Sequence, residues 1–153
     1  MLAPTGLFET HLNVSDLPRS IAFYRDVVGL EPAHLVRDRA AAFFWIGGRG
    51  RAMLGLWGGS SSPNAMRLHI AFALPLPEVL AAPGRLRGLG VQPLDFHGAP
   101  TGEPTVLGWM PAAAVYFRDP DGHSLEVLAM LDAPPRPNLG NLPWQAWQRA
   151  TTP

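Results

Sequence analysis

Three side chains with metal-ligating chemistry lie on strand-like stretches of this sequence: His11, His69 and Glu126. Each occupies an alternating position in a run whose neighbouring positions are mostly apolar, within residues 7–14, 67–74 and 124–130. Because successive side chains of a strand point to opposite faces, all three project from the face opposite the apolar one. Two imidazoles and one carboxylate on the open side of a sheet predict a shared cavity that holds a divalent ion.

The length of 153 residues fits one domain, or two small modules that share a core. Twelve basic and twelve acidic residues give a net charge of zero, so the chain lacks the positive charge typical of proteins that bind nucleic acid or an anionic membrane. We therefore expect a small neutral or amphipathic substrate. The absence of cysteine excludes disulfides, thiolate zinc sites and a cysteine nucleophile, which leaves histidine and carboxylate as ligands.

The amino terminus lacks a basic segment followed by an apolar one, and no run approaches the ~20 apolar residues of a membrane span. We expect a cytoplasmic protein. The high proline and glycine content is not a sign of disorder, because 47% of the residues are hydrophobic.

The two halves of the chain repeat one plan. The first half predicts a strand at 7–14, a helix from Ser15 or Asp16 to Gly29 with Pro18 in its first turn, and strands at 31–37, 40–46 and 51–57. A linker-like stretch follows at 58–63. The second half predicts a strand at 67–74, a helix at 76–89 interrupted near Pro83 and Gly84, a strand at 91–96, a long loop at 97–109, and strands at 112–118 and 124–130.

Both halves are therefore βαβββ, with module one at 7–57 and module two at 67–130 inside one domain, 1–131. The alignment of His11 with His69 gives an offset of 58, and that of Gly55 with Glu126 gives 71. Such a duplication predicts an α+β fold in which the modules form one curved mixed sheet with a central cavity. Residues 132–153 form a proline-rich extension whose short amphipathic segment is expected to cap a partner or the cavity mouth; its apolar residues are Leu142, Trp144 and Trp147.

Residues 119–122, Asp-Pro-Asp-Gly, have the composition of a type I turn. They join the last two strands as a tight hairpin, which places Tyr116 and Glu126 on neighbouring strands.

Two segments resemble the opening and closing signatures of the vicinal oxygen chelate superfamily: HLNVSDLPRSIAFYRDVVGL at 11–30 and VYFRDPDGHSLEVLAM at 115–130. This superfamily includes glyoxalase I, extradiol dioxygenases, fosfomycin-resistance thiol transferases and bleomycin-resistance proteins. The resemblance covers residues 7–131. It implies paired βαβββ modules, a homodimer, and a divalent ion held by the first and last strands of each module.

Carried over residue by residue, the resemblance implies metal ligands at His11, His69 and Glu126. Gly55 stands where glyoxalase I has a fourth ligand, a glutamate that serves as base, and glycine cannot do that work. A two-histidine, one-carboxylate set instead leaves coordination positions open for substrate oxygens or O₂. Glu9 shares the face of His11 and is a candidate to hold the tautomer of its ring.

Other interpretations remain open. A single histidine on a strand is more often a hydrogen-bonded structural residue than a ligand, and an inherited but vacant site is the main alternative to metal binding. We do not expect His34, His97 or His123 to belong to the site, and His123, which follows a turn, is expected to face solvent.

Candidate substrate contacts lie on the cavity side of their strands, at Asn13, Met53, Trp57 and Tyr116, although each could equally fill core. The resemblance makes Tyr116 a hydrogen-bond donor or general acid, beside Glu126 as a catalytic residue. Trp109 ends the long loop and is a candidate lid residue. Phe43, Phe44 and Trp45 are consecutive, so at least one must face the cavity or a subunit interface.

These observations predict a metal-dependent lyase or dioxygenase acting on a small organic substrate, with Zn, Ni, Mn and Fe equally compatible with the ligands. The competing class is a non-catalytic protein that sequesters an aromatic compound, as bleomycin-resistance proteins do. Phosphonate binding is disfavoured because residues 98–110 contain no Lys or Arg. Ring cleavage is only weakly supported, by Tyr116. The sequence leaves open whether one chain or two form the metal site.

Overall fold

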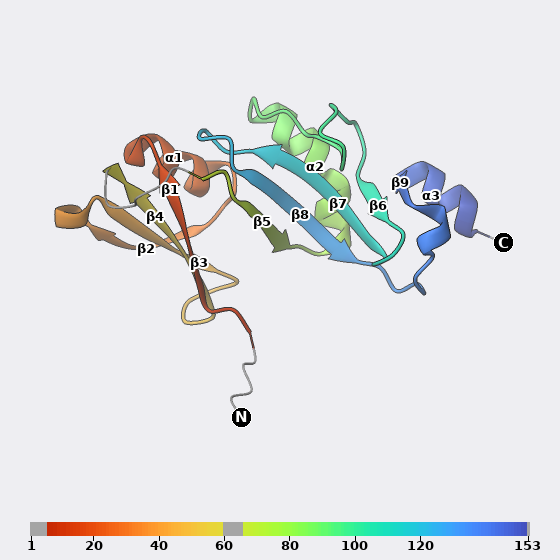
Figure 1. Ribbon diagram of the computed structural model, residues 1–153, viewed down its shortest axis with the longest axis horizontal. Helices are drawn as coiled ribbons and strands as arrows, with labels where there is room; N and C mark the ends of the chain where they lie inside the picture. Colours follow the sequence, from red (N-terminus) through yellow and green to blue (C-terminus); the bar gives the residue numbers. More distant parts are fainter. Residues whose placement is uncertain (1–5, 60–65, 153) are drawn as a thin grey trace. The chain divides into compact units, whose positions relative to one another are not determined.

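The computed structural model describes residues 6–59 and 66–152 and divides the chain into two compact units. The first unit runs to Leu68 and includes the 119–122 turn, and the second comprises 69–118 and the residues from 123 onward. Each unit carries a mixed sheet with a helix packed on it (Figure 1). The predicted α+β class and the repeated βαβββ plan are confirmed.

The first unit is a four-stranded sheet in the order β1-β4-β3-β2. β1 (Glu9–Val14) and β4 (Ala52–Gly58) are parallel, whereas β3 (Ala41–Ile46) is antiparallel to β4 and to β2 (Glu31–Val36). Helix α1 (Leu17–Asp26) packs on β3 and β4, and the short helix η1 (Arg37–Arg39) links β2 to β3. The predicted alternation holds in β1, because Leu12 and Val14 are buried while Glu9 and His11 are exposed.

The second unit is a five-stranded sheet in the order β5-β8-β7-β6-β9. Its strands are β5 (His69–Ala73), β6 (Thr105–Leu107), β7 (Ala112–Arg118), β8 (Ser124–Met130) and β9 (Asn141–Pro143). β5 and β8 are parallel, and the other pairs are antiparallel. Helix α2 (Leu76–Gly88) packs on β7 and β8. After η3 (Pro137–Leu139), β9 extends the sheet beside β6 and leads into α3 (Trp144–Thr151), whose Trp147 is buried.

Two expectations for the second unit are wrong. The strand predicted at 91–96 is absent: Leu94 makes only isolated bridges, to Pro100 and Tyr116, and the third strand is β6, inside the predicted long loop. Pro93 lacks the N–H that a strand needs at that point. Helix α2 is not interrupted, since Pro83 lies within it and is buried. A proline inside a helix removes one backbone hydrogen bond. Packing of the helix face on the sheet compensates for the loss of this hydrogen bond.

The internal repeat agrees in element order but differs in strand register. His11 pairs with Gly55, whereas His69 pairs with Ser124, and it is Ala71 that pairs with Glu126. One sequence alignment matches His11 with His69, and the other matches Gly55 with Glu126. The strand registers that these two alignments imply therefore differ by two residues. A shift of two keeps every side chain on its expected face. If Gly55 is the counterpart of Glu126, the counterpart of His69 is Glu9.

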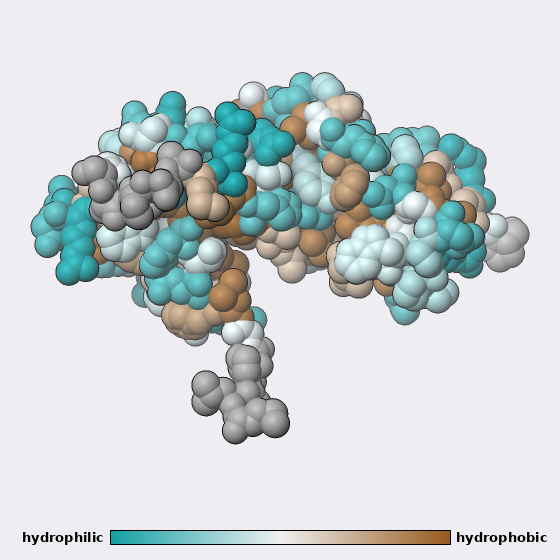
Figure 2. Space-filling view, in the orientation of Figure 1, coloured by the Kyte–Doolittle hydropathy of each residue, from teal (hydrophilic) through white to brown (hydrophobic). Residues whose placement is uncertain are grey.

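The surface mixes hydrophilic and hydrophobic residues in both units, as the face in Figure 2 shows. Large apolar side chains that are more than half exposed include Phe8, Met66, Trp109 and Met130. Within the described ranges, no helix is both long and apolar enough to cross a membrane. The predicted linker at 58–63 lies mostly outside the described residues.

Helix α1 begins where the sequence predicts. Asp16 caps it, accepting a hydrogen bond from the backbone N–H of Arg19 at 3.0 Å, and Pro18 lies in the first turn. Gly29, just beyond the helix, adopts a φ of +79°, which is unfavourable for other residues.

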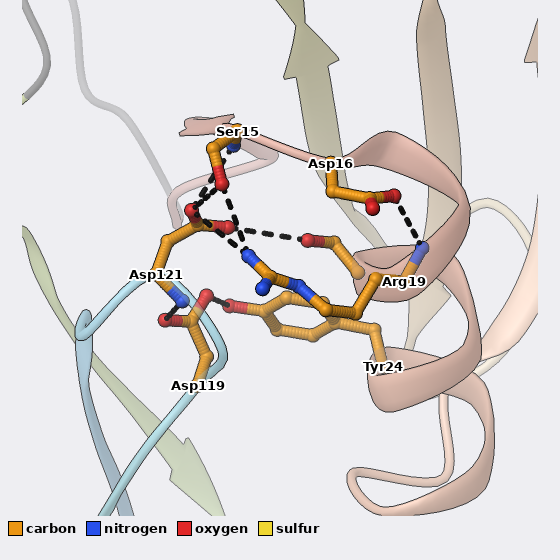
Figure 3. A network of polar contacts seen from close by, with 7 residues as sticks. Ser15, Asp16, Arg19, Tyr24, Asp119 and Asp121 are labelled. Atoms are coloured by element: carbon orange, nitrogen blue, oxygen red, sulfur yellow. Dashed lines mark hydrogen bonds and ion pairs between the residues drawn. The ribbon is translucent and has the colours of Figure 1, made fainter.

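The 119–122 turn is anchored to α1 by a polar network (Figure 3). The Tyr24 hydroxyl donates to Asp119 Oδ2 at 3.0 Å in a buried hydrogen bond. The backbone N–H of Ser15 donates to Asp121 Oδ1 at 3.1 Å, the Ser15 hydroxyl donates to the same oxygen, and Arg19 lies 3.4 Å from it. The turn itself closes through the N–H of Gly122 to the carbonyl of Asp119 at 3.0 Å, as predicted for the hairpin.

Candidate metal centre

His69 and Glu126 form the central pair of the candidate site. They lie on the parallel strands β5 and β8, and His69 Nε2 is 3.1 Å from Glu126 Oε2. The Glu126 side chain is 7% exposed and that of His69 is 51% exposed. The carboxylate is therefore held inside the unit, whereas the imidazole meets it from the open face of the sheet.

The geometry of this pair fits a shared cation. Two donors that each lie about 2.1 Å from one ion are about 3.0 to 3.4 Å apart, depending on the coordination angle. The observed 3.1 Å is also the length of an ordinary hydrogen bond. The other carboxylate oxygen, Glu126 Oε1, is buried and meets no donor at ordinary hydrogen-bond geometry, although the neighbouring Tyr116 hydroxyl also interacts with this carboxylate. An oxygen in this position has a lone pair that a cation could use.

Tyr116 completes the surroundings of the pair. It stands directly opposite Glu126 in the β7–β8 register, as the predicted hairpin requires, and its ring stacks on that of His69 with centroids 6.2 Å apart. Burial, followed by the negative charge of Glu126, raises the pKa of the Tyr116 hydroxyl. The phenol therefore keeps its proton and is available as a hydrogen-bond donor. Phe96, which the sequence did not single out, packs edge-on against Tyr116 with centroids 6.1 Å apart.

His11 belongs to the first unit and lies in an aromatic setting. Its ring centroid is 5.6 Å from that of Trp57 and 6.0 Å from that of Phe43. Its Nε2 is 3.1 Å from Glu9 Oε1. The expected contact between Glu9 and His11 is thus present, and one member of the Phe43–Trp45 run reaches the face that carries His11.

Donor groups come in pairs rather than triads within each unit. Among the residues that the structure describes, no group of three or more His, Asp or Glu side chains is close enough to hold a metal ion. The three predicted ligands derive from two units, His11 from the first and His69 with Glu126 from the second.

The predicted substrate contacts differ in exposure. Asn13, Met53, Trp57 and Tyr116 are half-buried on the faces that carry the histidines, whereas Trp109 is 63% exposed in a turn before β7. Trp57 also lines an open cavity of about 500 Å³ at the end of β4. The other residues that line this cavity are Arg37, Asp38, Arg39, Ala40, Gly58 and Gly59.

The remaining histidines form no group of three or more possible metal ligands among the described residues. His34 is exposed on β2, and His97 is exposed with its ring against Phe96. The expectation that His123 faces solvent is wrong, because it is only 2% exposed. It follows Gly122 directly and enters the core as β8 begins, which its place after a turn did not reveal.

The paired βαβββ units define a class of protein, and comparison with known proteins identifies that class. The sequence profile of the Glyoxalase/Bleomycin resistance protein/Dioxygenase superfamily matches residues 6–127. The chain belongs to this superfamily, which confirms the resemblance to vicinal oxygen chelate proteins.

Solved structures agree with this assignment. An integron cassette protein from the mobile metagenome of a Halifax Harbour sewage outfall is 31% identical with a TM-score of 0.71, over 83% of this chain and 100% of that one. A lactoylglutathione lyase from Agrobacterium tumefaciens is 28% identical with a TM-score of 0.62, over 82% and 94% of the two chains. The fosfomycin resistance protein FosX from Mesorhizobium loti, at 20% identity, 85% and 96% coverage and a TM-score of 0.58, shares the fold.

Proposed function

We propose that this protein is a divalent-metal-dependent enzyme of glyoxalase or dioxygenase type that acts on a small organic substrate. His11, His69 and Glu126 would hold the ion. The observation that carries the proposal is the pair of His69 and Glu126, with donors 3.1 Å apart and a second carboxylate oxygen that is buried and unpartnered. Beside the contact with His69, the second oxygen keeps a lone pair that could bind a cation.

When bound, the ion would act as a Lewis acid towards substrate oxygens, which suits both lyase and dioxygenase chemistry. The residues of the chain then have separate tasks. Tyr116, whose phenol keeps its proton, donates a hydrogen bond to a substrate oxygen beside Glu126. Trp57 and Met53 would offer apolar surface for the organic part of the substrate, and Asn13 a polar contact. Trp109, which is exposed in the turn before β7, would be a lid residue.

The residue at position 55 limits the reactions that the site could catalyse. Gly55 pairs with His11, and a glycine has no carboxylate that could accept a substrate proton. A route that needs a base at this position is therefore disfavoured, even though a lactoylglutathione lyase is among the similar structures.

The first test is metal binding by purified, chelator-treated protein. We expect one Zn²⁺, Ni²⁺, Mn²⁺ or Fe²⁺ per chain by calorimetry and elemental analysis. His69→Ala and Glu126→Gln should each lower the affinity by roughly 100-fold or more, since each removes a ligand. His34→Ala is the matched control, because His34 is exposed on β2, and it should bind as the native protein does. Absence of stoichiometric binding, or equal affinity in the His69 variant, refutes the proposal.

A second candidate is a metal-free binder of aromatic compounds, in the manner of bleomycin-resistance proteins. The half-buried rings of Phe43 and Trp57 around His11 favour it, because they offer stacking surface that needs no ion. Quenching of tryptophan fluorescence by planar aromatic compounds discriminates the two classes. Equal binding with and without chelator supports the binder, and metal-dependent binding supports the enzyme.

A further inference from the structure

A cavity of about 500 Å³ opens at the end of β4, and its described lining residues belong to the first unit. The lining comes from η1 with Ala40, which follows it, and from the residues 57–59 at the end of β4. These two segments meet because β3, which begins directly after Ala40, pairs with β4. The backbone N–H of Gly58 donates to the carbonyl of Ala40 at 2.8 Å and fixes the junction. The cavity is therefore formed at one sheet, and its volume is in the range of small-molecule sites.

Two arginines of η1, Arg37 and Arg39, line this cavity and are exposed. Among the residues that the structure describes, neither forms an ion pair with a carboxylate, in contrast to Arg25 and Arg49. Asp38 lies between them and also lines the cavity, so two positive charges and one negative charge leave a positive balance. A planar guanidinium can bind the two oxygens of a carboxylate through paired hydrogen bonds. The η1 side of the cavity therefore favours an anion.

Trp57 forms the apolar wall of the same cavity. The side chain is half-buried, and its ring centroid is 5.6 Å from that of His11 and 6.2 Å from that of Phe43. Its indole N–H is buried and meets no acceptor among the described residues. A buried donor without an acceptor is costly, and an oxygen of a bound ligand could supply the acceptor. Trp57 therefore offers a flat surface for a planar group beside the two arginines.

The turn that carries the arginines has an unfavourable backbone conformation. Ala40, which ends η1 and lines the cavity, adopts φ 48° and ψ 47°, in the left-handed region. Among the described residues it is the one non-glycine residue with a positive φ. A residue with a Cβ adopts this conformation at a cost in free energy, and such residues gather at binding sites. The strain at Ala40 thus marks, independently of charge, the same turn as the unpaired arginines.

From these observations we propose that the cavity binds the carboxylate of a planar organic acid, with Arg37 and Arg39 on the charge and Trp57 against the planar part. The two arginines are then specificity-determining residues, because a neutral compound of the same shape gains nothing from them. The inference rests on the proposed function, since Trp57 is also a proposed substrate contact, and it adds the class of substrate. An amphipathic anion of this kind agrees with the expectation of a small amphipathic substrate.

The test measures, by calorimetry, the binding of naphthoate and of naphthamide, a neutral compound of almost the same shape. We expect the native protein to bind naphthoate more tightly. Arg37→Gln and Arg39→Gln should each lower the affinity for naphthoate by about 3- to 10-fold and leave that for naphthamide unchanged, because each removes one charged contact. Asp38→Asn, which removes the competing negative charge, should raise the affinity for naphthoate. Arg49→Gln is the matched control, because it removes an equal charge from an exposed arginine that pairs with Glu31; it should bind as the native protein does.

All titrations use chelator-treated protein, so that the carboxylate cannot bind an ion and the result does not depend on metal. Trp57→Leu should weaken the binding of both compounds, since it removes the flat surface and keeps the charges. Equal affinity of the native protein for the two compounds, or native affinity for naphthoate in both arginine variants, overturns the inference. If naphthoate binds as expected but the protein takes up no divalent ion, the proposed metal-dependent function fails and the carboxylate site stands. If the ion binds stoichiometrically but naphthoate binding is independent of the arginines, this inference alone fails.

Discussion

Among the residues that the structure describes, Tyr24 is the largest fully buried side chain, and its hydroxyl has a defined partner in Asp119. Burial, and then the charge of Asp119, raises the pKa of the Tyr24 hydroxyl, so it keeps its proton at neutral pH and acts as a donor. Asp119 is itself 5% exposed and also accepts from the backbone N–H of Asp121. A buried carboxylate of this kind depends on its donors.

Removal of this donor should destabilise the first unit. We expect Tyr24→Phe to lower the free energy of unfolding by about 1.5 to 3 kcal/mol, because a buried hydrogen bond to a charged group is lost while the ring packing is kept. Urea denaturation measures the change, and an unaltered m-value serves as the internal control for the unfolded state. An unchanged midpoint would mean that the hydrogen bond contributes nothing to folding.

At the scale of elements, α1 and the 119–122 turn are coupled by the carboxylate of Asp121 (Figure 3). Burial alone would raise the pKa of Asp121, but hydrogen bonds from Ser15, the charge of Arg19 and a hydrogen bond from Ser20 outweigh it and lower the pKa below its usual 3.8. A carboxyl group whose pKa is depressed by folding contributes stability above its unfolded pKa and loses that contribution as pH falls through the folded value.

The stability contributed by Asp121 should therefore decrease as the pH falls. At neutral pH we expect Asp121→Asn to be less stable than the native protein, and the gap should shrink as the pH falls from about 5 to below 3. Thermal denaturation across this range measures it. Asp38→Asn, a substitution of an exposed aspartate in η1, is the control and should stay close to the native protein throughout. A gap that is constant with pH would contradict the assignment.

At the scale of the whole molecule, the sheet faces that bear the histidines are open. The side chains of His11 and His69 are 46% and 51% exposed, and Phe8 and Trp109 are exposed large apolar residues. The face drawn in Figure 2 carries both hydrophilic and hydrophobic residues. Exposed apolar side chains of this size are suited to contact with another polypeptide surface.

We expect the protein to be a homodimer, as the superfamily resemblance implies. Light scattering coupled to size-exclusion chromatography should give twice the mass of the chain at micromolar concentration. Because bound metal and subunit association would act on the same folded state, Zn²⁺ should also raise the melting temperature. If the protein is a monomer and still binds metal stoichiometrically, a second subunit is not required for the metal site.

The sequence by itself determined the class of fold, the family and the side of each strand on which the candidate ligands lie. Alternation of apolar residues identified β7 and β8 at their observed bounds, and the 119–122 turn placed Tyr116 opposite Glu126. These features are local, because a period of two and the composition of a turn are properties of a few consecutive residues.

Only the tertiary structure decided the rest. The three-residue strand β6 is too short to show alternation, and the burial of His123 depends on what packs around it. The two-residue register difference is invisible to a period of two, so Glu9 became comparable with His69 only when the hydrogen-bonded partners of β1 and β5 were known. The face of a strand is encoded in its own residues, whereas its register is a property of two strands that meet only in the folded chain.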